Sequence, residues 1–213
     1  MAVATETAFD ARSLGVSYRF WIVGITPLLT HNPATMRVTE HGIKRKGSRA
    51  EIPPPDVEAG AGCYRLPTGE FGLPAVAFRE ALLRAAREYP VPSRKRGRVV
   101  PVLSVFLGHV IALPELTVLR DPESGLPLTA YEIDIRRVVV QRQGVLRARP
   151  KFWPWACEVE FIANPELIAH EKTAEILETV LTDAGGRIGV GDYRPGQGGP
   201  FGRFRVELRG EGG

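Results

Sequence analysis

The chain has 213 residues, 44% of them apolar, and a formal net charge of +4. This length suits one large domain with its own core, and no apolar run is long enough to span a membrane. Cys63 and Cys157 form no CxxC pair, which argues against a disulfide framework and a zinc site. The N-terminus lacks a positive-then-apolar signal pattern. The sequence therefore predicts a cytoplasmic protein with no membrane partner.

The N-terminal part of the chain predicts one strand followed by a long insertion. Residues 18–25 are rich in β-branched and aromatic residues and apolar on nearly both faces, which is typical of a central strand. Residues 31–62 are polar and basic and contain three consecutive prolines, so we interpret them as an insertion or mobile loop. A short hairpin that turns at Thr68-Gly69 is expected next.

A helix and a second strand follow. Pro74 favours a first helical turn, and apolar residues at helical spacing continue the predicted helix to about Glu88. Residues 102–113 are expected to form the second strand.

The C-terminal part predicts a strand, a helix and a last strand. Residues 156–162 alternate, which places Glu158 and Glu160 on the outward face. Asn164-Pro165 is expected to cap the second helix, and Gly185-Gly186 to end it. Residues 203–209 form the last predicted strand.

These elements follow the order β-α-β-β-α-β, the split βαβ pattern of a ferredoxin-like (RRM-like) fold in the α+β class. We therefore expect a single domain over residues 15–209. Its two insertions are placed at about 31–62 and 114–153, and residues 1–14 and 210–213 are expected to be loose termini.

The second insertion is predicted to contain a basic hairpin over residues 132–152, with its turn near Gln143-Gly144. An ordinary solvated β-ribbon explains the pattern equally well. Cations interleaved with aromatic residues on a protruding hairpin are also how proteins grip single-stranded nucleic acid. The candidate contacts are Arg136, Arg137, Arg142, Arg147, Arg149, Lys151, Phe152 and Trp153.

A glycine-rich loop separates the second helix from the last strand. Residues 185–204 read GGRIGVGDYRPGQGGPFGRF, and glycines with arginine between them suit contact with a phosphate-bearing partner. A flexible connection is the alternative reading. The candidate contacts here are Arg187, Tyr193, Arg194, Gly198, Gly199, Gly202 and Arg203. A further basic cluster in the first insertion adds Lys44, Arg45 and Lys46.

On these residues the chain resembles the RAMP superfamily of CRISPR-associated RNA-binding proteins. The likeness lies in the helix opening Gly72-Leu73-Pro74 and in the loop spacing Gly189-x-Gly191 and Gly199-x-x-Gly202. Within the superfamily the chain is most similar to the guide-RNA backbone subunit (the seventh Cas family). In that subunit a hairpin thumb projects between the second and third core strands, the place that residues 132–151 occupy here.

The resemblance implies a backbone subunit of a CRISPR-type ribonucleoprotein effector in antiviral defence. Such a subunit coats single-stranded guide RNA in multiple copies, with no catalytic residue, metal or cofactor. The implied partners are guide RNA, copies of the chain itself, other effector subunits, and target DNA or RNA.

Two other functions stay open from the sequence. A metal-independent endoribonuclease of the RAMP type would process guide RNA and would need a general acid or base, for which His31 or His41 is the candidate. A phage or mobile-element protein that binds single-stranded DNA is the other, because no one-dimensional signature separates RNA from DNA binding.

Overall fold

The computed structural model describes residues 14–34, 53–92, 99–101, 109–140, 143–164 and 172–212. Its fold belongs to the α+β class. The helices are α2 (Pro55–Ala61), α3 (Val76–Ala85) and α5 (Thr173–Arg187), with short 3-10 turns η2 (Ala86–Glu88) and η4 (Pro195–Gln197). The first strands are β1 (Val16–Gly24), β2 (Leu28–Leu29), β3 (Tyr64–Arg65), β4 (Phe71–Pro74), β5 (Pro90–Pro92) and β6 (Val99–Pro101). The later strands are β7 (Ile111–Leu113), β8 (Leu116–Val118), β9 (Glu132–Val140), β10 (Gln143–Phe152), β11 (Ala156–Ala163) and β12 (Phe204–Gly212).

The largest sheet has the order β12-β1-β11-β7, and each neighbouring pair is antiparallel. β1 lies between β12 and β11, so the prediction of a central first strand is confirmed. Its residues Phe20 and Ile22 are fully buried, since a strand with neighbours on both sides and a helix layer over one face is excluded from water.

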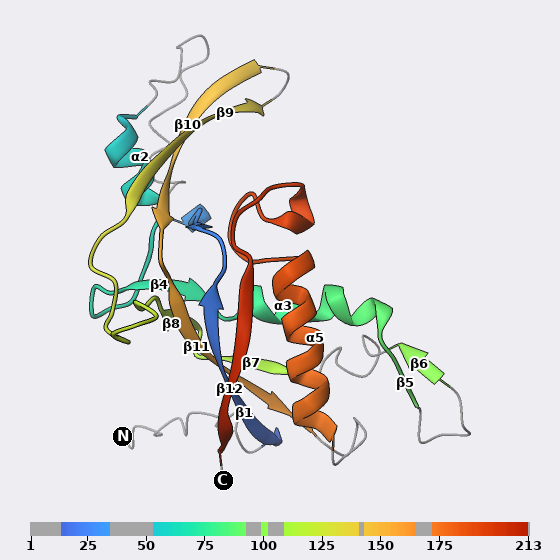
Figure 1. The fold of residues 1–213 in the computed structure, drawn as a ribbon. Helices are drawn as coiled ribbons and strands as arrows, with labels where there is room; N and C mark the ends of the chain where they lie inside the picture. The colour runs from blue at the N-terminus through green and yellow to red at the C-terminus, as the bar shows by residue number, and fades with distance from the viewer. Residues whose placement is uncertain are drawn as a thin grey trace, which may run out of the picture.

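Helices α3 and α5 cross in contact with each other, and α5 lies against β12 (Figure 1). The aromatic ring of Phe78 in α3 meets that of Phe204 in β12 edge-on, with centroids 5.5 Å apart. Leu82, Leu177 and Leu181 join the same buried cluster as the inward face of the sheet. Burial of these side chains is the main favourable term that holds the two layers together.

The sequence predicted that Gly185-Gly186 ends the second helix, and this prediction is wrong. α5 continues through both residues to Arg187. A Cβ atom at Gly185 would collide with the backbone oxygen of Phe204, so this glycine lets the helix approach β12 closely. The expected cap at Asn164-Pro165 cannot be compared in full, because residues 165–171 lie outside the described residues.

Two strand predictions also need correction or restriction. Glu160, expected to face outward, is only 7% exposed and accepts a 2.5 Å hydrogen bond from the Ser17 hydroxyl of the adjacent β1. A buried carboxylate requires such a partner. Of the second strand expected over residues 102–113, the described part is β7, and residues 102–108 lie outside the described residues.

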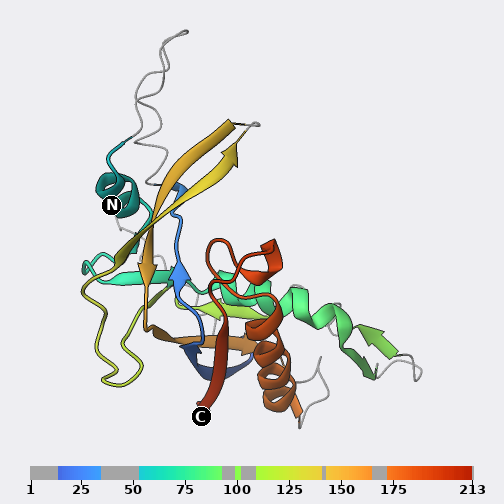
Figure 2. The same cartoon turned by 45° about the horizontal axis from the view of Figure 1, so that its top comes forward.

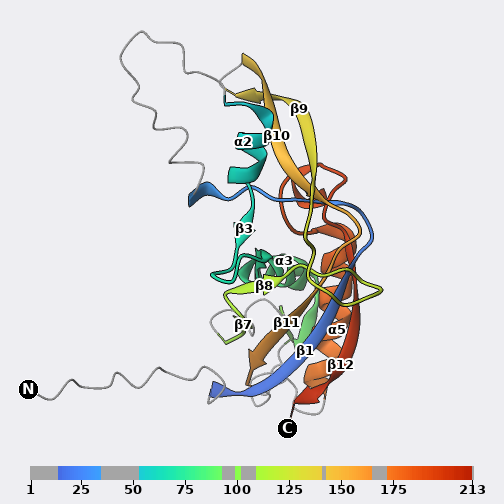
Figure 3. The same ribbon diagram turned by 90° about the vertical axis from the view of Figure 1, so that its left-hand side faces the viewer.

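The insertion between β7 and β11 forms the hairpin β9–β10, which projects away from the main sheet (Figure 1, Figure 2). Gln143 and Gly144 pair with Val140 and Val139, so the expected turn at Gln143-Gly144 is wrong; residues 141–142 lie outside the described residues. β2 pairs with the last two residues of β10, and α2 packs along β10 (Figure 3). The short β3–β4 hairpin turns at Gly69, whose φ is +96°, as predicted.

Candidate nucleic-acid interface

The hairpin is fixed in direction by helix α2. Glu58 of α2 is only 4% exposed, and its carboxylate accepts hydrogen bonds of 3.0 Å from the backbone N–H of Ala148 and from Nη1 of Arg147. A buried carboxylate is stable only with such donors. Arg147, expected to hold phosphate, therefore has a structural partner.

Most of the described cations of the hairpin are paired with anionic side chains. The pairs are Arg136 with Asp134, Arg147 with Glu58, Arg149 with Asp192, and Lys151 with Glu132. Arg137 is exposed and makes no hydrogen bond or ion pair to any described residue. Glu132 is exposed, and because exposed ion pairs contribute little free energy, a phosphate can replace it at low cost. Asp134 is only 12% exposed and accepts two hydrogen bonds from Arg136, so its replacement costs more. Replacing the buried Glu58 as the partner of Arg147 is far less favourable.

The hairpin and the glycine-rich loop (residues 185–204) meet and form one surface. The guanidinium of Arg136 in β9 lies over the ring of Phe201 in the loop, 4.6 Å from its centroid. Arg149 of β10 forms an ion pair with Asp192 of the loop. Figure 3 shows the loop beside the lower part of the hairpin. Two segments chosen separately from the sequence are thus joined by two direct contacts.

The aromatic candidates differ in their availability. Phe152 is 1% exposed and packs against Phe71 and Tyr131, with ring centroids 5.1 and 5.9 Å away. Its ring has no open face for a base, which argues against the expected stacking role. Trp153 is 49% exposed and Tyr193 is 43% exposed. These two rings can stack on a nucleobase.

The backbone N–H groups of the candidate loop glycines are hydrogen-bonded within the protein. The N–H groups of Gly198, Gly199 and Gly202 donate to the carbonyl oxygens of Pro195, Arg194 and Pro27. Gly198 and Gly202 have φ values of +79° and +67°, which favour glycine. These three N–H groups are therefore already hydrogen-bonded, and the expectation that they would meet phosphate loses its support.

The loop is also tied to the segment that follows β1. Asp192 N donates to Leu29 O at 2.8 Å, Gly202 N donates to Pro27 O at 2.8 Å, and Arg203 N donates to the Thr26 hydroxyl oxygen at 3.0 Å. The same segment pairs with the base of the hairpin through β2. The loop is thus held by several backbone hydrogen bonds, which argues against the alternative reading of a flexible connection.

The three loop arginines have partners within the fold. Arg187 makes 2.6 Å and 3.0 Å ion pairs with Asp183 and Glu88, and these hydrogen bonds raise the pKa of its guanidinium. Arg203 donates to the carbonyl oxygen of Gly186, at the C-terminal end of α5, where a cation is favoured. Arg194 donates to Gly191 O at 2.8 Å. Of these, Arg187 is the least available to a ligand.

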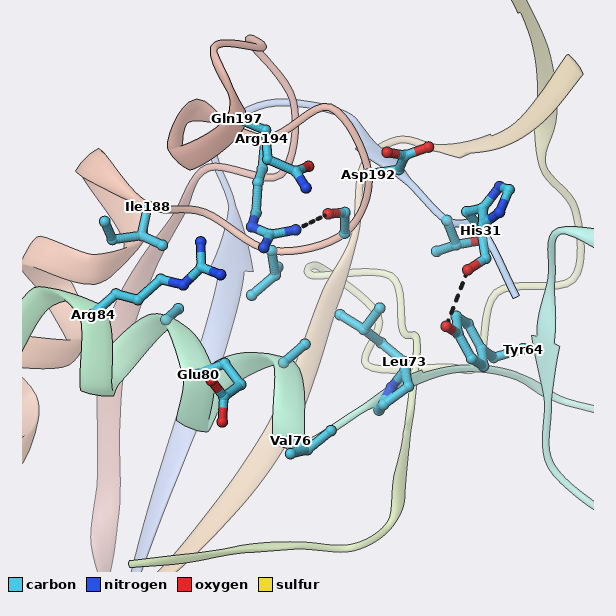
Figure 4. Close-up of a pocket in the computed structure, with 16 residues that line it drawn as sticks. His31, Tyr64, Leu73, Val76, Glu80, Arg84, Ile188, Asp192, Arg194 and Gln197 are labelled. Atoms are coloured by element: carbon cyan, nitrogen blue, oxygen red, sulfur yellow. Dashed lines mark hydrogen bonds between the residues drawn. The ribbon is translucent and has the colours of Figure 1, made fainter. Parts of the chain in front are cut away.

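A cavity of about 380 Å³ lies between α3, the loop and the segment after β1 (Figure 4). His31, the histidine considered for catalysis, is exposed and lines this cavity. The Tyr64 hydroxyl donates to the backbone oxygen of His31 at 3.1 Å. Arg84 of α3 and Arg194 of the loop line the opposite end.

The sequence analysis did not single out Phe201, Arg84 or Tyr64. Phe201 lies in the same Gly-Pro-Phe-Gly-Arg run as two selected glycines, so its position was a usable signal. Arg84 and Tyr64 become neighbours of the loop only through the packing of α3 and β3, and no spacing in the sequence indicates this. His41, Lys44, Arg45, Lys46 and Arg142 lie outside the described residues.

No protein-family model matches the chain, and no curated protein matches it. Within the described ranges, no three His, Cys, Asp or Glu side chains gather as metal ligands would. In the same ranges, every helix is too short or too polar to cross a bilayer.

Proposed function

We propose that the chain binds single-stranded RNA across the joint surface of the β9–β10 hairpin and the glycine-rich loop. The observation that carries the proposal is the contact of Arg136 with Phe201, which unites the basic hairpin with the loop. Tyr193 supplies an exposed ring. Arg137, the next residue of β9, points to the opposite face of the hairpin, where its guanidinium has no partner among the described residues. Guanidinium groups next to exposed rings match a strand that has phosphates on one side and bases on the other.

The finer fold assignment is part of the same proposal. We count β1, β7, β11 and β12 as core strands 1, 2, 3 and 4. The sheet order β12-β1-β11-β7 is then 4-1-3-2. This order, with α3 and α5 as crossovers, supports a ferredoxin-like core. In the sequence, the hairpin is inserted between β7 and β11, the second and third core strands. This position supports the likeness to a guide-RNA backbone subunit of a CRISPR-type effector.

The backbone role requires several copies on one strand, and this can be measured. Native mass spectrometry on single-stranded RNAs of increasing length should show one further copy for each fixed increment of nucleotides. A complex with one protein copy at every length contradicts the backbone role and leaves a stand-alone binder. Single-stranded DNA of the same sequence, run in parallel, tests the alternative of a DNA-binding protein from a phage or mobile element.

A second candidate function is favoured by one observation, the position of His31 on the cavity beside Tyr64. Cleavage of RNA next to the 2′-hydroxyl needs a general base or acid, and an exposed histidine suits that role. Labelled RNA incubated with the protein without metal tests it. Strands that stay whole support the binding role, whereas cleavage abolished by His31→Ala supports the endoribonuclease.

A further inference from the structure

Two guanidinium groups lie at one end of the cavity between α3 and the glycine-rich loop. Figure 4 shows Arg84 reaching from α3 and Arg194 from the loop toward the same space. The guanidinium of Arg84 makes no hydrogen bond or ion pair to any described residue, and that of Arg194 donates only to Gly191 O, a neutral oxygen. Both cations thus lack an anionic partner in the described part of the chain.

The carboxylates that line the cavity supply only part of the missing charge. The negative charge of Asp192 acts to raise the pKa of Arg194, but its ion pair is with another arginine. Glu80 forms a 3.3 Å ion pair with Arg79, and Asp192 forms one with Arg149. Burial and the positive charge of Arg84 both lower the pKa of Arg194, which indicates that the two cations repel each other. An anion between them would relieve this repulsion and gain charge-assisted hydrogen bonds.

Further hydrogen-bond donors lie beside the two arginines. The backbone N–H groups of Gly191 and Arg194 have no acceptor among the described residues, although most other N–H groups of the loop do. The two groups are not consecutive, because the N–H groups of Asp192 and Tyr193 between them donate to Leu29 O and to Asp192 Oδ1, so each of the two is a single donor.

The other end of the cavity is lined by rings. His31 and Tyr64 stand opposite the arginines, with Leu73 and Val76 between the two ends (Figure 4). The cavity therefore has two guanidinium groups at one end and two rings at the other, where the carboxylate of Asp192 also lies (Figure 4). Its volume of about 380 Å³ lies within the range of small-ligand sites.

We propose that this cavity binds one nucleotide through its terminal phosphate. The phosphate lies between Arg84 and Arg194, and the base extends toward His31 and Tyr64. A phosphomonoester carries nearly two negative charges near pH 7 and so matches two guanidinium groups, whereas a bridging phosphodiester carries one. The ligand class is thus a nucleoside monophosphate, either free or as the phosphorylated 5′ end of a strand.

The inference deepens the proposed function in one respect, because it assumes that the chain handles nucleotides. It uses none of the hairpin residues that carry that proposal. Binding of a mononucleotide and binding of a long strand are therefore separable measurements on the same protein.

Isothermal titration of the full chain with AMP, inorganic phosphate and adenosine tests the cavity. We expect AMP to bind more tightly than either of its parts. Arg84→Gln should weaken AMP binding by about tenfold or more, since it removes a charge-assisted contact. The Arg84 side chain is exposed and has no hydrogen-bond or ion-pair partner among the described residues, so this variant should stay folded. Arg87→Gln, an equal charge change one helical turn further on, is the control and should bind AMP as the wild type does.

Absence of AMP binding, or equal affinity in Arg84→Gln and wild type, would overturn the inference. Competition against AMP identifies the source of the phosphate. A short 5′-phosphorylated RNA that competes, with a 5′-hydroxyl twin that does not, assigns the cavity to a strand end. If neither RNA competes, the ligand is a free nucleotide. Equal competition by both RNAs contradicts recognition of a phosphomonoester.

A long 5′-hydroxyl RNA titrated into the same variants separates the two proposals. In the wild type, strand binding without AMP binding removes the cavity inference alone, whereas in Arg84→Gln weakened AMP binding with unchanged strand binding supports it. AMP binding without strand binding removes the proposed function alone.

Discussion

Asp192 of the glycine-rich loop and Arg149 of the hairpin form an ion pair in which both side chains are largely shielded, with exposed fractions of 25% and 16%. The buried Nε of Arg149 faces the carboxylate without the alignment of a hydrogen bond, so the contact is chiefly ionic. Asp192 is an anion in a loop otherwise rich in donors. Its role is explained by this pairing, because it holds the loop against the hairpin.

The pair should be energetically coupled. In the wild type, Tyr193 N donates to Asp192 Oδ1 at 2.8 Å. Asp192→Asn keeps this acceptor but leaves the partly buried Arg149 without an anionic partner. We expect a loss of about 1–2 kcal/mol in the free energy of unfolding, discounted for partial exposure. Urea unfolding of Asp192→Asn, Arg149→Gln and the double variant measures the coupling. Strictly additive losses would show that the contact stabilises nothing.

Loss of the exposed hairpin cations should change the salt dependence of RNA binding. Arg136→Gln with Arg137→Gln removes two candidate phosphate contacts, which should reduce the log–log salt slope by about 1.4 on single strands. Arg205→Gln is the matched control, because the Arg205 side chain is exposed on β12 and paired with Glu207. Filter binding across a salt series gives the slopes. An unchanged slope in a folded double variant rejects the hairpin as the phosphate contact.

Arg147 should behave differently from Arg137, although both are hairpin arginines. Arg147→Ala leaves Glu58, which is 4% exposed, with the backbone N–H of Ala148 as its remaining donor from the hairpin. We expect a loss of about 1–3 kcal/mol in unfolding free energy. Arg137→Ala should leave stability unchanged within about 0.5 kcal/mol. Thermal melts of both variants decide this, and equal melting temperatures would refute the structural role of Arg147.

The loop glycines should affect stability in a fixed order. A Cβ atom at Gly199 would collide with Tyr193 O, and at Gly202 with Val190 O, so alanine should destabilise each by about 1–3 kcal/mol. Gly198 has a positive φ but open space, so Gly198→Ala should cost about 1 kcal/mol. Chemical denaturation of the three variants gives the order. Tolerance of all three would restore the flexible-connection reading.

The adjacent glycines of α5 offer an internally matched pair. Gly185→Ala places a Cβ atom against the backbone of β12 and should destabilise the fold by about 1–3 kcal/mol. Gly186→Ala meets no atom within 4 Å and should stabilise the helix by about 0.5–1 kcal/mol. Opposite signs in the two melting shifts are expected. Shifts of the same sign would mean that α5 ends before these residues after all.

The cysteine thiols should be protected and should make stability depend on pH. Burial raises the pKa of Cys63 from its ordinary value of 9.0 to about 11, and burial also raises that of Cys157. The folded state keeps its thiol protons as pH rises above 9, while the unfolded state loses them. Stability is therefore full below pH 9 and falls as pH rises toward 11. Urea unfolding at a series of pH values, with Cys63→Ala as control, should show a shallower fall in the variant. Rapid thiol labelling of the native protein at pH 8 would contradict the burial of both groups.

The sequence predicted local and periodic features well and tertiary contacts poorly. The central first strand, the turn at Gly69 and the basic hairpin follow from apolar alternation and turn chemistry, which act over a few residues. The burial of Glu160 and the helical conformation of Gly185 depend on the neighbouring strand, which composition does not indicate. The partners of Arg147 and Arg149 lie 89 and 43 residues away in sequence, so charge clustering alone suggested a free cationic surface.

The short segment between β1 and the first insertion has a mechanical consequence. Residues 26–30 pair with the foot of the hairpin and also accept backbone hydrogen bonds from Asp192, Gly202 and Arg203 of the loop. The β9–β10 hairpin and the glycine-rich loop are thus both bonded to residues 26–30, which directly follow the central strand β1. Thr30 of this segment also lines the neighbouring cavity, so one short stretch of backbone positions the hairpin, the loop and part of the cavity wall.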